Sequence, residues 1–172
     1  DLMTARAGIE ACSAAVRDNP GVLRFQFQLG RALLRARRRD EGLPYLLNAA
    51  DKGYKAAYAL IGGTYQFDLG NYSEALKWYR KGADLKDPVS ETHLAEMYME
   101  GWGVKQSMSE ALRWYKPSAK DGYPLAQYKI GVIFQRGDST VRKNDREAVQ
   151  WFQRAANLGF ARAQNDLGWS YE

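Results

Sequence analysis

The sequence predicts an all-α fold, a right-handed α-solenoid of stacked antiparallel helix pairs, from three observations. The segment SEALKWY at 73–79 returns as SEALRWY at 109–115 and as REAVQWF at 146–152. Bulky and small apolar side chains recur at helical spacing, and no segment alternates apolar and polar residues as a strand does. Capping residues stand where the helices are expected to begin and end. The chain therefore repeats one structural unit, a pair of helices.

A glutamate opens the repeated segment in the second helix of each pair. These glutamates are Glu41, Glu74, Glu110 and Glu147, at intervals of 33, 36 and 37 residues. An aromatic residue follows each of them by four positions, and a small pair such as Ala155-Ala156 follows by eight and nine. This spacing keeps both on one helix face. We expect the aromatic residues to lie in the core; they are Tyr45, Trp78, Trp114 and Trp151.

The first helix of each pair carries a second set of anchors, in which a small residue follows a bulky one. The anchors are Leu29-Gly30, Ile61-Gly62, Leu94-Ala95, Ile130-Gly131 and Leu167-Gly168. A bulky residue follows the small one by three positions in every case, as at Tyr65 and Phe134. Small residues on this face let the neighbouring helix approach closely.

The predicted helix ends agree with the two sets of anchors. Asn71, Ser107 and Asn144 each stand three residues before a glutamate, which is the capping-box arrangement at a helix start. A glycine followed by an aromatic residue comes after three of the second helices, as in a left-handed glycine cap. These pairs are Gly53-Tyr54, Gly122-Tyr123 and Gly159-Phe160.

Length and composition favour one folded repeat domain over residues 1–172. Apolar residues make up 45% of the chain and charged residues 26%, and the net charge is +5. No apolar run of about 18 residues occurs, so we expect no membrane insertion. The expected units are a leading helix at 4–20, repeats at 21–54, 55–87, 88–123 and 124–160, and an incomplete repeat at 161–172.

The repeated anchors and helix ends resemble those of the Sel1-like repeat family, which is related to the tetratricopeptide repeats. The family pattern of Ala-Gln, then Leu-Gly, then an aromatic residue appears as AQYKIGVIF at 126–134 and AQNDLGWSY at 163–171. The glycine loop and the helix that follows it appear as EGWGVKQSMSEALRWYKPSAKDGY at 100–123. The N-terminal part, with GIEACSAAVRDNP at 8–20, is more similar to a plain tetratricopeptide repeat.

Residue types that catalyse reactions or bind metals are scarce. Cys12 is the only cysteine and His93 the only histidine, and we expect them in repeats that do not touch. Glu96 and Glu100 lie one helical turn apart, but a solvated acidic surface explains them better than a cation site does. We therefore expect no catalytic residue, no metal site, no cofactor and no small-molecule substrate.

The resemblance implies that the first helix of each pair lines a concave groove that grips peptides. The register assigns to this surface Arg24, Phe27, Arg31, Arg35, Phe67, Glu96, Glu100, Tyr128, Arg136 and Trp169, and also Gln66. Arginines can hold carboxylates through paired hydrogen bonds, and exposed aromatic side chains make good interface anchors. The alternative is that Arg31 and Arg35 are solvated arginines whose stems pack on the protein.

The sequence thus predicts a non-enzymatic scaffold or adaptor that binds a protein or peptide, for example one with an acidic segment. A nucleic acid is a weaker alternative, because Asp40 and Glu41 follow the run of arginines at 35–39. A contact between two copies through the C-terminal end is another. The resemblance also admits a regulatory or targeting segment of a larger enzyme, such as a bacterial caspase-like protease. It favours a bacterial periplasmic or secreted protein, although the residues themselves assign no compartment.

Overall fold

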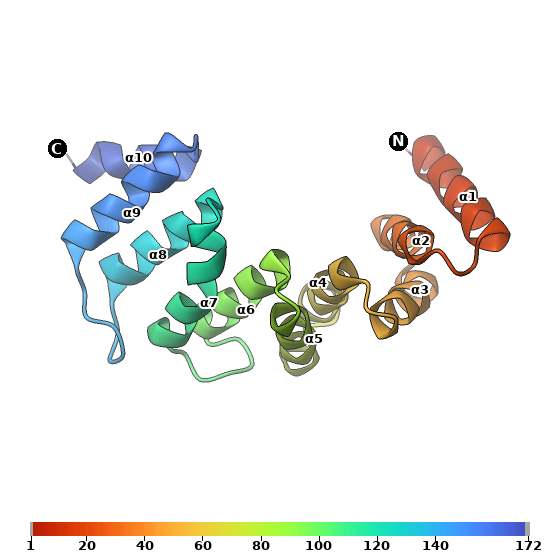
Figure 1. Cartoon of the computed structure of the whole chain (residues 1–172), viewed down its shortest axis with the longest axis horizontal. Coiled ribbons are helices and arrows are strands. Elements are labelled where there is room, and N and C mark those ends of the chain that lie inside the picture. Colours follow the sequence, from red (N-terminus) through yellow and green to blue (C-terminus); the bar gives the residue numbers. More distant parts are fainter. Residues whose placement is uncertain (1, 171–172) are drawn as a thin grey trace. The chain divides into compact units, whose positions relative to one another are not determined.

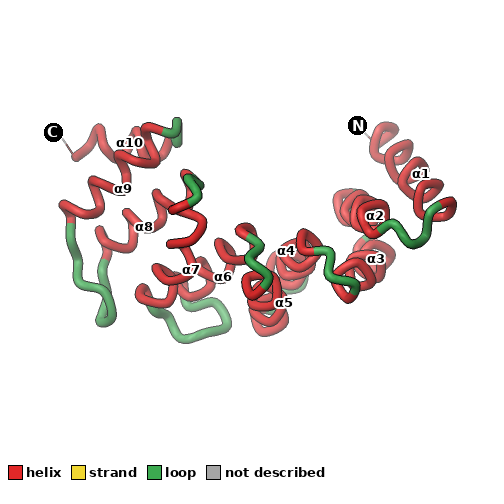
Figure 2. The backbone as a smooth tube through the Cα atoms, in the orientation of Figure 1, coloured by secondary structure: helices red, strands yellow, loops and turns green. Residues whose placement is uncertain are grey.

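The computed structural model describes the backbone of residues 2–170 and the side chains of residues 6–167. All regular elements within these residues are helical, which confirms the predicted all-α class. They are α1 (Leu2–Asp18), α2 (Leu23–Arg35), α3 (Arg39–Asp51), α4 (Lys55–Gly63), the π-helical turn η1 (Thr64–Asp68), α5 (Tyr72–Asp84), α6 (Pro88–Glu100), α7 (Met108–Lys120), α8 (Pro124–Arg136), α9 (Asp145–Asn157) and α10 (Ala161–Ser170) (Figures 1 and 2). None of the described helices is long and apolar enough to cross a bilayer.

The chain forms two compact units, Asp1–Asp87 (unit 1) and Pro88–Glu172 (unit 2). In unit 1, each of the helices α1 to α5 packs mainly against its neighbours in the chain. In unit 2, the same holds for α6 to α10. Such neighbour packing is what stacked helix pairs require, because each pair buries its apolar face against the next. The boundary between the units coincides with a predicted repeat boundary.

The small residues of the first helices are sites of close helix contact, as predicted. A Cβ atom added to Gly62 would lie 2.6 Å from the Tyr79 ring, and one added to Gly131 would lie 2.5 Å from the Phe152 ring. A Cβ atom added to Gly30 would lie 2.6 Å from the side chain of Leu46. These distances leave no room for a methyl group, so the bulky side chain of the second helix rests directly on the backbone of the first.

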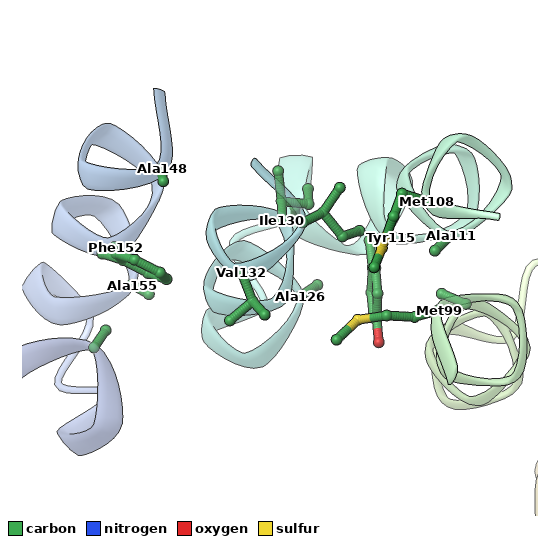
Figure 3. Packing of buried hydrophobic residues seen from close by; sticks show 14 of the residues in the cluster. Met99, Met108, Ala111, Tyr115, Ala126, Ile130, Val132, Ala148, Phe152 and Ala155 are labelled. Atoms are coloured by element: carbon green, nitrogen blue, oxygen red, sulfur yellow. The ribbon is translucent and has the colours of Figure 1, made fainter. Parts of the chain in front are cut away.

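The core aromatic residue lies one position later than predicted. Tyr79, Tyr115 and Phe152 are almost completely buried, whereas Trp78, Trp114 and Trp151 are half-buried at the edge of the core clusters. In these three helices the buried face starts at the alanine that follows the glutamate. The residue four positions beyond that alanine lies in the core (Figure 3). The side chains of Lys81, Arg113 and Arg154 lie over the three tryptophan rings, at 4.6, 5.6 and 4.4 Å from the ring centroids.

The predicted helix ends are confirmed. The side chains of Asn71, Ser107 and Asn144 accept hydrogen bonds from the backbone N–H groups of Glu74, Glu110 and Glu147. The predicted glycine caps have left-handed backbone, with φ of +82° at Gly53, +84° at Gly122 and +81° at Gly159. Glycine adopts this conformation without the steric cost that other residues pay.

The loop from α8 to α9 is hydrogen-bonded to the start of α7. The Asp138 carboxylate accepts a hydrogen bond of 2.9 Å from Met108 N, and others from Val141 N and from the backbone and hydroxyl of Thr140. Ser109 N donates to the Thr140 hydroxyl at 3.0 Å. Burial acts to raise the pKa of Asp138, but the hydrogen bonds outweigh it and lower the pKa to about 2. The loop thus accepts hydrogen bonds from backbone N–H groups that have no partner within the first turn of α7. These hydrogen bonds connect one repeat to the next.

We predict that Asp138→Asn lowers the free energy of unfolding by about 1 kcal/mol at pH 7, as the loss of a helix cap does. The folded pKa of Asp138, about 2, lies below its ordinary value of 3.8. The stabilisation is therefore complete above the ordinary pKa and is lost as the pH falls through the folded pKa. Urea unfolding followed by circular dichroism should show a difference between wild type and variant that disappears near pH 2.

Asp121→Asn provides the control, because Asp121 is exposed at the end of α7. This variant should lose no stability at pH 7, because Asp121 caps no helix start. A difference for Asp138→Asn that stays constant from neutral pH to pH 2 would contradict the role given to its carboxylate.

Candidate partner-binding surface

In unit 1, one side of α2 presents three arginines. Arg24, Arg31 and Arg35 are exposed, and none of them forms an ion pair with a described residue. The Arg31 guanidinium lies 5.7 Å from the centroid of the Phe27 ring, a cation–π distance. Phe27 itself is half-buried against Tyr54, with ring centroids 5.1 Å apart. The predicted arginines are therefore accessible, while Phe27 forms the floor under them.

Arg35 and Phe67, which the sequence predicts on the same surface, line one hollow in unit 1. Its volume is about 590 Å³, and its lining consists of Leu34, Arg35, Arg37, Arg39, Asp40, Phe67 and Asp68. Phe67 is 67% exposed, more than any other large apolar side chain among the described residues. A side chain so apolar and so accessible, beside arginines, is typical of an interface anchor. We call Arg24, Phe27, Arg31, Arg35 and Phe67 the unit 1 surface.

Phe67 lies in a helix that has one extra residue. The helices α2, α6 and α8 each have 13 residues, whereas α4 has nine and η1 a further five. The extra residue is accommodated as a π-helical turn, a feature common at functional sites. Gln66 of this turn is buried, and it accepts a hydrogen bond of 2.7 Å from the Tyr79 hydroxyl. The prediction that Gln66 lies on the surface is wrong, and Phe67 takes the exposed position.

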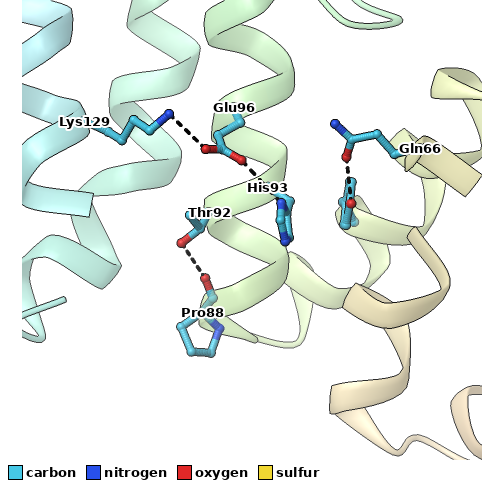
Figure 4. Close-up of polar contacts among 7 residues, drawn as sticks. Gln66, Pro88, Thr92, His93, Glu96 and Lys129 are labelled. Carbon is cyan, nitrogen blue, oxygen red and sulfur yellow. Dashed lines mark hydrogen bonds and ion pairs between the residues drawn. The ribbon is translucent and has the colours of Figure 1, made fainter. Parts of the chain in front are cut away.

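In unit 2, the predicted acidic residues are neutralised by the next repeat. Glu96 of α6 is 3.0 Å from Lys129 of α8, and Glu100 is 3.6 Å from Arg136 of α8. Glu96 also lies 3.4 Å from Nδ1 of His93 (Figure 4). Burial acts to raise the pKa of Glu96, but His93 and Lys129 together outweigh it, and the pKa is lowered. These carboxylates hold helices together, so a partner would have to displace the cations to reach them.

Tyr128 is likewise engaged within unit 2. Its hydroxyl donates a hydrogen bond of 2.9 Å to Asp166 of α10. Its ring packs against Phe152 and Phe160, with centroids 5.5 and 5.1 Å away. Burial and the bond to Asp166 both raise the pKa of Tyr128. The side chain of Trp169, the last predicted site residue, lies outside the described residues.

The sequence pattern did not indicate the roles of several residues that shape these surfaces, and it included Arg37 only in the run of arginines at 35–39. Arg37 lines the hollow from a turn, where its backbone is left-handed with a φ of +59°. The turns after the other first helices have a glycine in such a conformation, so an arginine there was a detectable signal. Lys129 and Asp166 were missed because the sequence analysis did not pair charges between successive repeats.

The described residues contain no group of three or more His, Cys, Asp or Glu side chains placed to hold a metal ion. Cys12 is half-buried against the cluster of Ile9, Leu29 and Leu33. Such packing is the usual environment of an unpaired cysteine.

Comparison with known proteins agrees with the repeat pattern. The Sel1 repeat model matches residues 54–87, 88–123 and 124–160. A Sel1 repeat protein from Oxalobacter formigenes is 26% identical with a TM-score of 0.81, over 99% of this chain and 75% of that one. A protective antigen of uropathogenic Escherichia coli strains, which has an SLR fold, is 26% identical with a TM-score of 0.54, over 95% of this chain and 44% of that one.

The fold also matches a Sel1 repeat protein from Klebsiella pneumoniae, at 16% identity and a TM-score of 0.54, over 91% of this chain and 96% of that one. No curated protein matches the sequence.

We predict that Lys129→Met lowers the free energy of unfolding by roughly 1–2 kcal/mol, because it leaves the half-buried Glu96 carboxylate without its nearest cation. Adding Glu96→Gln should recover part of that loss, since the neutral amide tolerates burial better. Urea unfolding of the two single variants and the double variant measures the coupling. Lys116→Met, at an exposed position on α7, is the control, and strictly additive losses would refute the pairing.

Proposed function

Because the chain belongs to the Sel1 repeat family, we propose that it is a scaffold that binds a protein or peptide partner through the unit 1 surface. Sel1 repeat proteins are generally non-catalytic scaffolds that bind other proteins. A non-enzymatic role for this chain is part of the same proposal. The unit 1 surface gives the proposal a definite site and a definite partner chemistry.

The observation that carries the proposal is a difference in charge pairing. In unit 2, Glu96 and Glu100 have cationic partners on the adjacent first helix. In unit 1, Arg31 and Arg35 have no acidic partner among the described residues and stay exposed. Exposed arginines without internal partners can bind carboxylates of another molecule at a smaller desolvation cost than paired ones.

The partner segment that fits this surface is acidic and carries apolar side chains. Arg24, Arg31 and Arg35 follow one another along α2, at positions 7 and 4 residues apart. That spacing puts the three guanidinium groups on one helix face, where they can meet successive carboxylates of an extended peptide. Phe67 supplies apolar area at the end of the row. Binding should weaken with added salt, because exposed charges are screened.

A nucleic acid fits the same surface less well. Arg38 forms two hydrogen bonds with Glu41, and Arg39 forms one with Asp40. The arginine run therefore offers fewer available cations than its sequence indicates, and Asp68 adds a negative charge to the hollow. A phosphate backbone needs a longer uninterrupted row of cations. Assembly through the C-terminal end and a role beside a catalytic domain stay predictions.

We predict that the double variant Arg31→Glu/Arg35→Glu loses the partner that wild type captures from native lysate. The reversed charges would repel the acidic segment that the arginines hold, so the amount captured should fall by about tenfold or more. Pull-downs that use the full chain as bait, followed by quantitative mass spectrometry, measure the amount of partner that is captured. Captured partner should also decrease as the salt concentration of the wash is raised.

Lys116→Glu/Lys120→Glu is the matched control, because both lysines are exposed on α7 and the change in net charge is the same. It should capture as much partner as wild type. Circular dichroism must show that both variants are as helical as wild type. Equal capture by wild type and Arg31→Glu/Arg35→Glu would exclude the unit 1 surface as the binding site.

A further inference from the structure

We propose that the hollow lined by Arg35, Arg37 and Phe67 is an anchoring pocket for one aromatic side chain of the partner, with a carboxylate next to it. This inference rests on the proposed function and names the residue type that unit 1 would recognise. A volume of about 590 Å³ can accommodate an aromatic side chain together with neighbouring atoms of its peptide. The occupant is thus an acidic peptide segment interrupted by an aromatic residue.

The apolar side of the pocket is formed by Phe67 and Leu34. Phe67 is 67% exposed, so much of its ring area is left for a partner to cover. Aromatic rings pack well on one another in offset or edge-to-face arrangements, which makes an aromatic side chain the favoured occupant. An aliphatic side chain would bury less area there and gain less.

The position of Phe67 is held by the interior of unit 1. The η1 turn is anchored by the hydrogen bond from the Tyr79 hydroxyl to the buried Gln66 side chain, next to Phe67 in the sequence (Figure 4). The Asn71 N–H also donates to the carbonyl oxygen of Tyr65, at 2.8 Å. A ring on an anchored turn loses less conformational freedom on binding than one on a loose loop.

The cationic side of the pocket contains an arginine in a costly backbone conformation. Arg37 has a φ of +59°, whereas the turns after α4–η1, α6 and α8 place Gly70, Gly101 and Gly137 at φ of +62°, +77° and +63°. A left-handed backbone is strained for a residue that has a Cβ atom. Glycine would stabilise this turn, but it would remove a guanidinium group from the pocket.

The charges of the pocket determine where a carboxylate can bind. Arg35 and Arg37 have no acidic partner among the described residues, while the side chain of Arg39 is hydrogen-bonded to Asp40. Asp68, at the end of η1, also lines the pocket, and its carboxylate repels anions that come close to it. The carboxylate of the bound segment therefore belongs beside Arg35 and Arg37.

The test uses fluorescein-labelled synthetic peptides and the full chain, with binding followed by fluorescence anisotropy. The first peptide has one phenylalanine flanked by two glutamates on each side. The second has alanine in place of the phenylalanine, and the third has glutamines in place of the glutamates. Wild type should bind the first peptide about tenfold more tightly than the second, as expected for one buried aromatic contact. Phe67→Ala should remove that preference.

Arg37→Gly separates binding from folding, because it should unfold at a higher urea concentration than wild type and still bind the first peptide several-fold more weakly. Lys86→Gly is its matched control: Lys86 also has a left-handed backbone, with a φ of +57°, but does not line the pocket. It should gain stability and bind normally. Asp68→Asn should strengthen binding of the first peptide by removing the repulsion.

Equal binding of the phenylalanine and alanine peptides would overturn the pocket, as would equal weakening by Arg37→Gly and Lys86→Gly. If wild type binds neither peptide yet still captures its partner through Arg31 and Arg35, the pocket is overturned and the proposed function stands. If capture does not depend on Arg31 and Arg35, the proposed function fails as well. Tighter binding of the glutamine peptide would also contradict the inference, because the arginines would then have no carboxylate to hold.

Discussion

The contact between a small residue on the first helix and a bulky side chain on the second is the constraint on which the rest of the structure depends. At Gly62 and Gly131 the ring of Tyr79 or Phe152 lies where a Cβ atom would have to be. A contact this close restricts both the rotation of each helix and its position along the axis, because any side chain in the place of the glycine would overlap the ring. The outer faces of the first helices then acquire defined rows of residues.

What those rows do differs between the two units. In unit 2 they place Glu96 of one first helix beside Lys129 of the next, so the surface charges serve the stacking of the repeats. In unit 1 the same kind of row displays Arg31, Arg35 and Phe67, and the two arginines have no acidic partner among the described residues. The stability of one unit and the binding surface proposed for the other thus come from one repeat geometry, with different residues at the exposed positions.

Much of the fold could be predicted, because anchors such as Tyr115 recur at a nearly constant spacing and their periodicity is that of a helix. The spacing predicts Trp114 rather than Tyr115 in the core, and this prediction is wrong. Two adjacent aromatic residues cannot be distinguished by their distance from a glutamate. The burial of Gln66 could not be predicted, because the spacing of the anchors does not show that the Tyr79 hydroxyl satisfies its side chain. Pairs such as Glu96 and Lys129 depend on how successive first helices are aligned, which the order of residues alone does not specify.

Hydrogen–deuterium exchange of the full chain, with and without its captured partner, tests the central claim most directly. If unit 1 binds the partner, exchange should slow in residues 23–37 and 55–70, which contain the unit 1 surface and the turns that line its pocket. Residues 88–100 and 124–136 should exchange at their usual rates, because their charges are already paired within unit 2. Protection confined to residues 88–172 would contradict the account.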